Sequence, residues 1–385
     1  MNILEWLAGE EQNINYKPKN NMVYPFTEKE KIEHNEFINK LGIKNINSNI
    51  QKVELIKSEE NLEKYNFFVN RKDDILDTEP HNWKDYIGQE ETKETIKETL
   101  EAIKQHKNIP YPHILISGNA GIGKSSLIHL LAEKSKLPLI ETVAGNLEEK
   151  KDVYELLAKL PKKPPYGIIF IDELAGISKI IGEILLPIIQ TFKVNNKPIP
   201  YFTFAGATTD LGLLNKKLSP LVDRCKQKFR LRPYNNEELA KIIYNQAKKR
   251  NIEFTEKALL EIASRSRETP RIALGYLDNI YYFALFRNIK KIDYLTAIEK
   301  MEKLKIYKLG ITNEDIELLK YLSIQEKPIG LSTLTQVLNI DELTYKNTLE
   351  PFLVRKKFIG KTSRGRILLE EGRKYLEKIK KKVKL

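Results

Sequence analysis

Residues 117–126 read SGNAGIGKSS, and this stretch decides the fold of the chain's central part. It follows a short apolar run, HILIS (113–117), and leads into KSSLIHLLAEKSK (124–136), which is typical of a helix. Residues 118–125 fit the pattern GxxxxGK[ST], and a strand before it with a helix after it is the context that a phosphate-binding loop requires. The glycines let backbone N–H groups curl around a phosphate, which the positive N-terminus of the helix also attracts. The sequence therefore predicts a nucleotide-binding α/β domain.

The side chains of this loop have separate expected tasks. We expect Lys124 to reach the β- and γ-phosphates of ATP, and the Ser125 hydroxyl to bind Mg²⁺. The residues expected to contact the nucleotide are Gly118, Asn119, Ala120, Gly121, Ile122, Gly123, Lys124, Ser125 and Ser126.

A second motif, IIFIDE (168–173), supplies the carboxylates that such a loop needs. Its apolar residues predict a buried strand that brings Asp172 to the carboxyl edge of the sheet, beside the Mg²⁺. Glu173 then points toward the water that attacks the γ-phosphate. Acidic residues at strand ends also serve as helix caps, but the adjacent pair favours hydrolysis over binding alone.

The chain has 385 residues, which at roughly 100–200 residues per domain suggests about two to four domains. No apolar run reaches the ~18 residues that a membrane helix needs, and the first residues lack the pattern of a secretory signal. The single cysteine, Cys225, excludes an internal disulfide and fits a reducing compartment. We therefore expect a cytoplasmic protein without a membrane partner.

The formal net charge of +13 is concentrated at the C-terminal end. Residues 355–385 hold 13 Lys and Arg against 3 Glu, so the rest of the chain is close to balanced. A basic segment of this kind indicates a polyanion partner. The alternative for the last residues, KIKKKVKL, is a solvated lysine-rich tail.

The pattern of the chain changes three times. Residues 1–75 are polar and turn-rich, with one helical stretch that Thr27 and Glu30 could cap. Apolar strands then alternate with helices to about residue 233, which predicts a parallel sheet covered on both faces. Within this α/β region, a helix is expected to end near Pro187 or shortly after, and a strand is expected at 201–209. Residues 234–305 are predicted to be all helical, with Thr255 as a cap. Residues 311–385 are predicted to form a last unit of two or three helices, followed by two short strands around a Ser-Arg-Gly turn.

Several segments together resemble the bacterial RuvB family of Holliday-junction branch-migration motors. They are DYIGQEETKETI, SGNAGIGKSSLIHLLA, IIFIDEL, FAGATTDLGLL, SPLVDRC, RSRETPRIAL and KTSRGR, in that order, from about Trp83 to Ile367. The combination of the TPR and TSRGR segments is more specific than the phosphate loop. The resemblance implies an AAA+ P-loop NTPase with a parallel sheet, a helical lid domain and a C-terminal winged-helix domain, assembled as a hexameric ring on DNA. The expected units are an N-terminal extension (1–75), the large ATPase domain (76–233), the lid (234–306) and the winged helix (307–385).

The resemblance also implies roles for residues outside the loop. Thr209 is similar to the sensor-1 residue that orients the lytic water, and Arg271 to the sensor-2 residue that ties the lid to the γ-phosphate. Arg224 resembles the arginine finger that reaches into a neighbouring subunit's site. Tyr86 and Ile87 match the YIGQ box near the adenine.

In the wing, the resemblance implies that Arg364 contacts a DNA phosphate. Lys361, Arg366 and the pair Lys356–Lys357 are expected to add to the same positive surface. Contacts of this type position a protein on the backbone and carry little sequence information.

The chain also departs from the family pattern. Only KVNNKPIPY (193–201) separates Phe192 from Phe202, which is too short for the family's long partner-docking hairpin, so a RuvA-type partner is in doubt. Glu79 stands where the family has Arg, and LVDRC leans toward the corresponding motif of clamp loaders. We expect the N-terminal region, or an unidentified loading protein, to replace the missing hairpin.

Three functions remain open on the sequence. The first is an ATP-driven DNA motor for branch migration or a related step in recombination and repair. The second is a clamp-loader-like or helicase-loader-like switch, which LVDRC and the short hairpin favour. The third is a DNA-binding scaffold that binds ATP without turnover, against which Glu173 and Arg224 count.

Overall fold

The computed structural model describes residues 78–106, 110–163 and 166–383, with side chains described as far as residue 379. The N-terminal extension expected at 1–75 lies outside these residues, and so does the helix cap expected at Thr27 and Glu30. All of the described residues belong to the unit that begins after residue 70.

The described residues form a five-stranded sheet in the order β2-β3-β6-β1-β7, and every pairing in it is parallel. This confirms the parallel sheet predicted for the large domain. The strands are β1 (Ile114–Ser117), β2 (Leu139–Val143), β3 (Ile168–Asp172), β6 (Thr203–Thr208) and β7 (Gln227–Arg230). β7 was not predicted. The loop before α5 and the ends of β3 and β6 all lie at the carboxyl edge of this sheet, where open α/β sheets bind their ligands.

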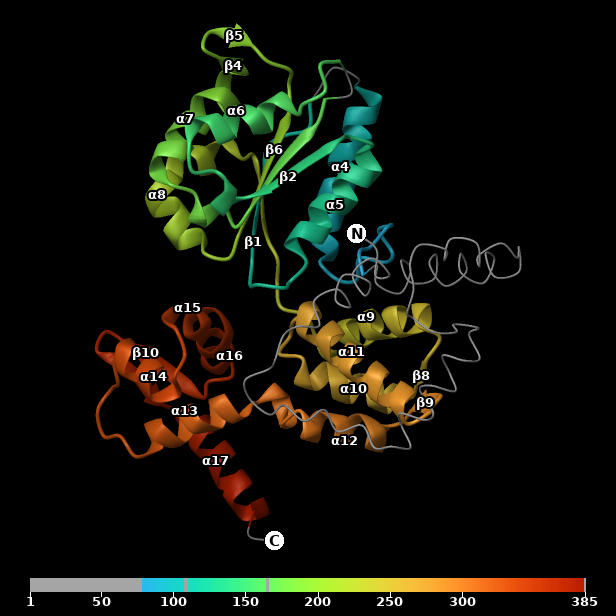
Figure 1. Cartoon of the computed structure of the whole chain (residues 1–385), viewed down its shortest axis with the longest axis vertical. Coiled ribbons are helices and arrows are strands. Elements are labelled where there is room, and N and C mark those ends of the chain that lie inside the picture. Colours follow the sequence, from blue (N-terminus) through green and yellow to red (C-terminus); the bar gives the residue numbers. More distant parts are fainter. Residues whose placement is uncertain (1–77, 107–109, 164–165, 384–385) are drawn as a thin grey trace, which may run out of the picture. The chain divides into compact units, whose positions relative to one another are not determined.

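Helices cover both faces of the sheet (Figure 1). The helices α4 (Glu90–Gln105) and α5 (Lys124–Ser135) share one apolar core with the strands, whereas α6 (Lys150–Ala158), α7 (Lys179–Thr191) and α8 (Leu211–Arg224) share another. The helix expected to end near Pro187 or shortly after ends at Thr191, so the prediction is confirmed.

The segment between α7 and β6 forms a very short hairpin. Its strands, β4 (Lys193–Val194) and β5 (Lys197–Pro198), have two residues each and pair antiparallel. Asn195 and Asn196 make the turn with φ angles of 49° and 65°, the left-handed backbone that a two-residue hairpin turn demands and that asparagine tolerates. The structure therefore agrees with the expectation that 193–201 cannot form a long hairpin.

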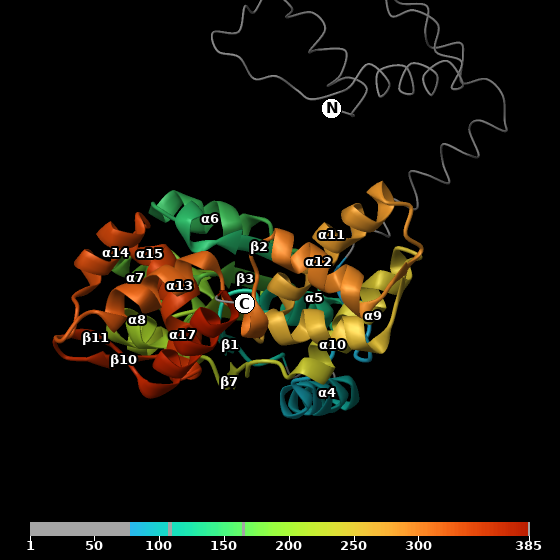
Figure 2. The same cartoon turned by 90° about the horizontal axis from the view of Figure 1, so that it is seen from below.

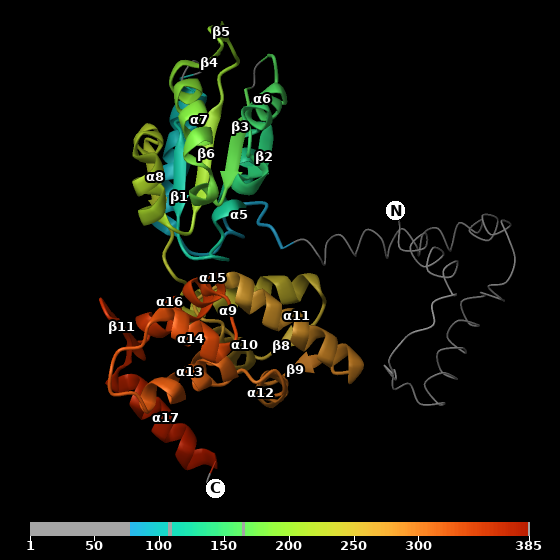
Figure 3. The same cartoon turned by 60° about the vertical axis from the view of Figure 1, so that its left-hand side comes forward.

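After β7 the chain enters the lid (Figure 3). The lid helices are α9 (Asn236–Lys249), α10 (Glu256–Arg265), α11 (Pro270–Phe286) and α12 (Tyr294–Lys303), which gather into one bundle (Figure 2). The predicted cap is confirmed, because Thr255 accepts a hydrogen bond from the Ala258 N–H. The prediction of an all-helical lid misses a minimal parallel pair, β8 (Glu253–Phe254) with β9 (Lys291–Ile292).

The last unit has its own apolar core. Its elements are α13 (Asn313–Ser323), α14 (Leu331–Leu338), α15 (Glu342–Thr344), a π-helical turn (Tyr345–Leu349), α16 (Glu350–Arg355), β10 (Ile359–Thr362), β11 (Gly365–Leu368) and α17 (Glu370–Val383). β10 and β11 pair antiparallel around the predicted Ser-Arg turn. The lysine-rich C-terminal segment, for which a tail was the alternative, is helical as far as Val383. Among the described residues, every helix is too short or too polar to cross a bilayer.

Candidate nucleotide and DNA sites

The phosphate loop between β1 and α5 has the backbone that its glycines predict. Gly121 and Gly123 have φ angles of 71° and 97°, in the left-handed region that favours glycine. A Cβ atom at Gly121 would lie 2.6 Å from the Cβ of Arg271, so a larger residue there would push the lid away from the loop. The loop therefore serves two purposes, since its backbone forms a phosphate cradle and also the seat of the lid.

Lys124 lies folded back over this cradle. Its ammonium donates to the carbonyl oxygens of Gly118, at 3.0 Å, and Asn119, at 3.1 Å. Burial holds the pKa of Lys124 below its ordinary value, and the carboxylates of Glu173 and Asp172 oppose this shift. An anion in the cradle would favour the charged ammonium further, as expected of a phosphate ligand.

The acidic edge of the site comes from the ends of β3 and β6. The Ser125 hydroxyl donates to Asp172 Oδ2 at 2.8 Å, so the two expected Mg²⁺ ligands lie side by side. Thr209 Oγ1 donates to Glu173 Oε1 at 2.5 Å. Glu173 has a left-handed backbone, with φ 49°, and its N–H donates to Asp172 Oδ1 at 2.8 Å. Such a conformation persists in a residue with a side chain only when its surroundings hold it.

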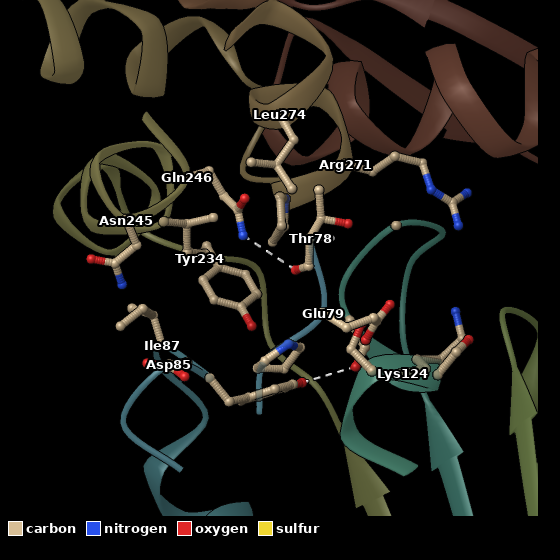
Figure 4. Close-up of a pocket in the computed structure, with 18 of the residues that line it drawn as sticks. Thr78, Glu79, Asp85, Ile87, Lys124, Tyr234, Asn245, Gln246, Arg271 and Leu274 are labelled. Atoms are coloured by element: carbon tan, nitrogen blue, oxygen red, sulfur yellow. Dashed lines mark hydrogen bonds between the residues drawn. The ribbon is translucent and has the colours of Figure 1, made fainter. Parts of the chain in front are cut away.

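These residues line one end of a cavity of about 830 Å³. Figure 4 shows Lys124 and Arg271 on one side of this cavity, and Ile87, Tyr234 and Asn245 on the other. The structure thus brings most of the predicted loop, both carboxylates and both sensor residues together with Tyr86 and Ile87 in a single pocket. Gly118, Asn119 and Ile122 lie outside the lining of this pocket, and Ile122 is buried in the core. The Tyr86 hydroxyl donates to the Gly123 carbonyl at 3.0 Å, and burial raises the pKa of Tyr86 well above its ordinary value.

Sequence reasoning missed several residues of the pocket lining. The missed residues include Thr78, Tyr234, Ile242, Asn245, Gln246 and Leu274. The Gln246 amide donates to the Thr78 carbonyl at 3.4 Å and so ties α9 to the first described residue. Gln246 is 7% exposed, on the face of α9 that also buries Ile243 and Ala247. A single amide within an apolar stripe carries no sequence signal for a ligand pocket, because such a stripe predicts only core packing. Tyr234 could have been found, since an aromatic residue in a domain connection commonly packs on both domains.

The two predicted arginines lie in different environments. Arg271 begins the lid helix α11, lines the pocket, and donates its backbone N–H to the Gly121 carbonyl at 3.3 Å. Arg224 ends α8 and is exposed, outside the set of described residues that line the pocket. With the Gln190 amide turned so that its oxygen faces the guanidinium, that oxygen accepts from Arg224 Nε at 2.6 Å and from Nη2 at 2.5 Å. The fold of one chain therefore does not bring Arg224 to its own phosphate loop.

Glu79 also lines the pocket, at the position where the family pattern has Arg. Its Oε2 lies 3.7 Å from His129 Nδ1, and His129 Nε2 lies 2.8 Å from Glu141 Oε2. The hydrogen bond with Glu79 raises the pKa of His129, against the effect of burial, and with the help of Glu141 brings it to about 9. An ion-paired group thus stands in place of the family's arginine contact.

The predicted DNA-binding residues of the wing separate into two groups. Arg364 is exposed in the turn between β10 and β11, and Lys361 is 63% exposed, with Nζ 3.7 Å from Glu350 Oε2. Arg366 is 8% exposed. Its Nε lies 2.5 Å from Glu350 Oε1, and its guanidinium lies 5.7 Å from the centre of the Tyr345 ring. Arg366 therefore differs from the expectation that it adds to the positive surface of the wing, because this side chain joins the hairpin to α16 inside the domain.

Lys356 also differs from the expectation. Its ammonium lies 2.7 Å from Glu268 Oε1 in the lid, whereas its neighbour Lys357 is exposed. Only one residue of this pair is therefore free of the lid.

Comparison with known proteins agrees with this architecture. Residues 78–231 match the Holliday junction DNA helicase RuvB P-loop domain, residues 234–307 the RuvB AAA lid domain, and residues 308–377 the RuvB C-terminal winged helix domain. The RuvB subunit of the Holliday junction branch migration complex from Helicobacter pylori strain Shi470 is 35% identical over 75% of this chain and 88% of that relative. The corresponding subunit from Nitratiruptor is 36% identical over the same shares.

Solved structures give the same result. The Thermotoga maritima RuvB Holliday junction branch migration motor superposes with a TM-score of 0.71 at 31% identity, covering 78% of this chain and 98% of the motor. A K64R mutant of the same protein superposes with a TM-score of 0.72. With three consecutive domains matched and a pocket built from their residues, the chain belongs to the RuvB family.

Proposed function

We propose that this chain is an ATP-driven DNA motor that drives branch migration at Holliday junctions. The observation that carries the proposal is one chain that joins a hydrolytic pocket to a winged helix. In the pocket, Ser125 meets Asp172 and Glu173 meets Thr209. The winged helix presents Arg364 and Lys361 to solvent.

The residues of the pocket divide the work of hydrolysis. Lys124 and the backbone N–H groups of the loop hold the β- and γ-phosphates, and Ser125 with Asp172 would hold Mg²⁺. A bound Mg²⁺ neutralises charge on the phosphates and aligns them for attack. Glu173 accepts the proton of the attacking water, and the Thr209 hydroxyl holds the Glu173 carboxylate at the edge of the sheet. Arg271 senses the γ-phosphate from the lid.

Arg224 completes the site from outside. It is exposed and lies outside its own chain's pocket, as a residue that serves a neighbouring subunit must. We therefore propose a closed ring, hexameric as the family resemblance implies, in which each Arg224 reaches the γ-phosphate of the next subunit.

The loader alternative is not favoured. LVDRC and the short hairpin favour it, whereas all three matched domains, including the winged helix, are those of RuvB. The scaffold alternative needs a pocket without a hydrolytic base, and Glu173 lies beside Thr209 at the sheet edge.

A junction assay tests the motor directly. The protein is mixed with a synthetic four-way junction and ATP, and the release of duplex arms is followed with a labelled strand. Arms are expected to separate with ATP but not with a non-hydrolysable analogue. ATP turnover that appears only when a sliding clamp is added, and that displaces no arms, would instead support the loader.

The loading partner is a separate proposal. The hairpin β4–β5 has only two residues per strand, so we propose that residues 1–75 or an unidentified protein supply the docking contact. Removing residues 1–75 is expected to abolish recruitment to junctions in cell extract while DNA-stimulated ATPase activity persists. Recruitment that is unchanged by the deletion would refute a role for this region.

A further inference from the structure

A five-residue segment, RETPR (267–271), contacts both the phosphate loop and the winged helix, and we call it the connecting segment. At its C-terminal end, Arg271 donates its backbone N–H to the Gly121 carbonyl at 3.3 Å. Thr269 packs against the same glycine, because its Cγ2 lies 3.1 Å from where a Cβ on Gly121 would stand. A displacement of Arg271 by a nucleotide would therefore move this segment directly.

At its N-terminal end, Arg267 is anchored in the winged-helix domain. Its guanidinium pairs with the fully buried Asp315 of α13, and its Nε donates to the Gly310 carbonyl at 2.7 Å. The guanidinium also lies 4.8 Å from the centre of the Phe352 ring. Breaking a buried pair of this type is costly, so Arg267 forms the fixed end of the connection.

Glu268, the next residue, makes a second and more exposed connection. Its Oε1 lies 2.7 Å from Lys356 Nζ, and its Oε2 lies 3.1 Å from Arg355 Nε. These two cations end α16 and lead directly into the β10–β11 hairpin that carries Arg364. Burial opposes ionisation of Glu268, but Lys356 and Arg355 hold its pKa below the ordinary value.

The backbone at this point is unusual as well. Arg267 and Glu268 have consecutive φ angles of 50° and 64°, a left-handed pair that is uncommon for residues with side chains. The Glu268 carbonyl in addition accepts from the Tyr234 N–H at 3.1 Å, in the connection between the large domain and the lid. Contacts on both sides thus hold a conformation that the residues do not favour by themselves.

We propose that Glu268 is a positioning residue that makes the DNA affinity of the winged helix depend on the nucleotide in the pocket. This rests on the proposed function, because it assumes that the pocket binds ATP and the wing binds DNA. When Arg271 is drawn toward a γ-phosphate, the connecting segment pivots on the buried Arg267–Asp315 pair. Glu268 then carries Lys356 and Arg355, and with them the start of the hairpin, to a new position.

The test compares DNA affinity in two nucleotide states. Binding of a short labelled duplex is measured with a non-hydrolysable ATP analogue and with ADP, for the wild type and for Glu268→Gln. The wild-type affinities are expected to differ by about 5–150-fold, the usual range of coupling between two sites. In Glu268→Gln this ratio should fall close to one, while ATPase activity without DNA is unchanged.

Two lysine variants provide matched controls. Lys356→Gln and Lys357→Gln remove the same charge from adjacent positions, but only Lys356 contacts Glu268. Lys357→Gln is expected to weaken DNA binding without changing its dependence on nucleotide, whereas Lys356→Gln should abolish that dependence. The double variant Glu268→Gln/Lys356→Gln should lose no more coupling than either single variant, because the two residues act as one pair.

Failure of this inference can be told apart from failure of the proposed function. A wild-type ratio above one that Glu268→Gln leaves intact would overturn the role of Glu268 and leave the motor unaffected. Equal wild-type affinities in both states would overturn it as well. A nucleotide-dependent affinity without arm displacement in the junction assay would instead refute the motor and retain the coupling.

Discussion

The nucleotide pocket and the wing differ in how strictly their sequence motifs fix the position of a side chain. In the pocket, Lys124, Asp172 and Glu173 all lie where the motifs predict. In the wing, Lys361 and Arg366 are directly paired across the hairpin, and both lie near Glu350, yet one is exposed and the other buried. A phosphate loop permits few backbone conformations, so its motif fixes where each side chain lies. In a basic hairpin, the neighbouring residues decide whether each cation is buried in an ion pair or exposed to solvent.

The largest expected effect concerns Arg224, which lies outside the pocket of its own chain and is proposed to complete the pocket of a neighbouring subunit. Replacing Arg224 with Ala should lower kcat for ATP by about 10³–10⁵-fold, the range for an arginine finger that neutralises transition-state charge. The affinity for ATP should change little, since an arginine finger acts mainly on charge that develops in the transition state. Steady-state ATPase assays combined with binding of a fluorescent ATP analogue measure both quantities.

Mixing provides the control for this variant. Arg224→Ala subunits combined with Lys124→Ala subunits should regain some of the activity, because some interfaces then pair an intact pocket with an intact finger. Absence of any recovery, in rings shown to be mixed, would contradict an action between subunits.

Glu173→Gln tests the pocket at the step of water activation. Loss of a general base should lower kcat by about 10²–10⁴-fold, with ATP still bound, because the Gln side chain keeps the size of Glu and can still accept from Thr209. A hydrolysis assay with a binding measurement checks this outcome. Faster turnover in this variant would refute the assigned role.

Much of the fold and most of the pocket could be predicted, and the failures have physical causes. β7 was missed because it lies at the edge of the sheet, where burial alternates along QKFR and a continuous apolar run is not required. Gln246 was missed because it is a single amide on the buried face of α9, whose apolar neighbours predict only core packing, and Asn245 because it is one of many polar residues in that helix. No pattern in the sequence announces the left-handed backbone of Arg267 and Glu268, since tertiary contacts impose it.

Substitution of Arg366 tests whether the buried cation of the wing stabilises the fold. Replacing Arg366 with Gln leaves Glu350 buried without its cation, and removing one partner of a buried pair costs about 3 kcal/mol. Glu350 is 7% exposed and Arg366 8%, so solvent screens this pair little. Urea unfolding followed by circular dichroism should show a lower free energy of unfolding for this variant.

Arg364→Gln is the matched substitution two residues away. It should leave the unfolding curve unchanged, and it should reduce the slope of log K for DNA against log salt by about 0.9, the value for one phosphate contact. Equal loss of stability in both variants would mean that the two arginines do not differ as their exposure indicates.

The smallest expected effect concerns His129, which pairs with Glu79 of the pocket lining and with Glu141. Its pKa of about 9 in the folded chain lies above the ordinary value of 6.5. The stabilisation from its charge is therefore complete below pH 6.5 and is lost as the pH rises through 9. Because His129 is 32% exposed, screening should limit the contribution to under about 1 kcal/mol. The urea midpoint of the wild type should therefore fall more between pH 6 and pH 10 than that of His129→Gln, and identical pH profiles would show that the two carboxylates do not hold the ring charged.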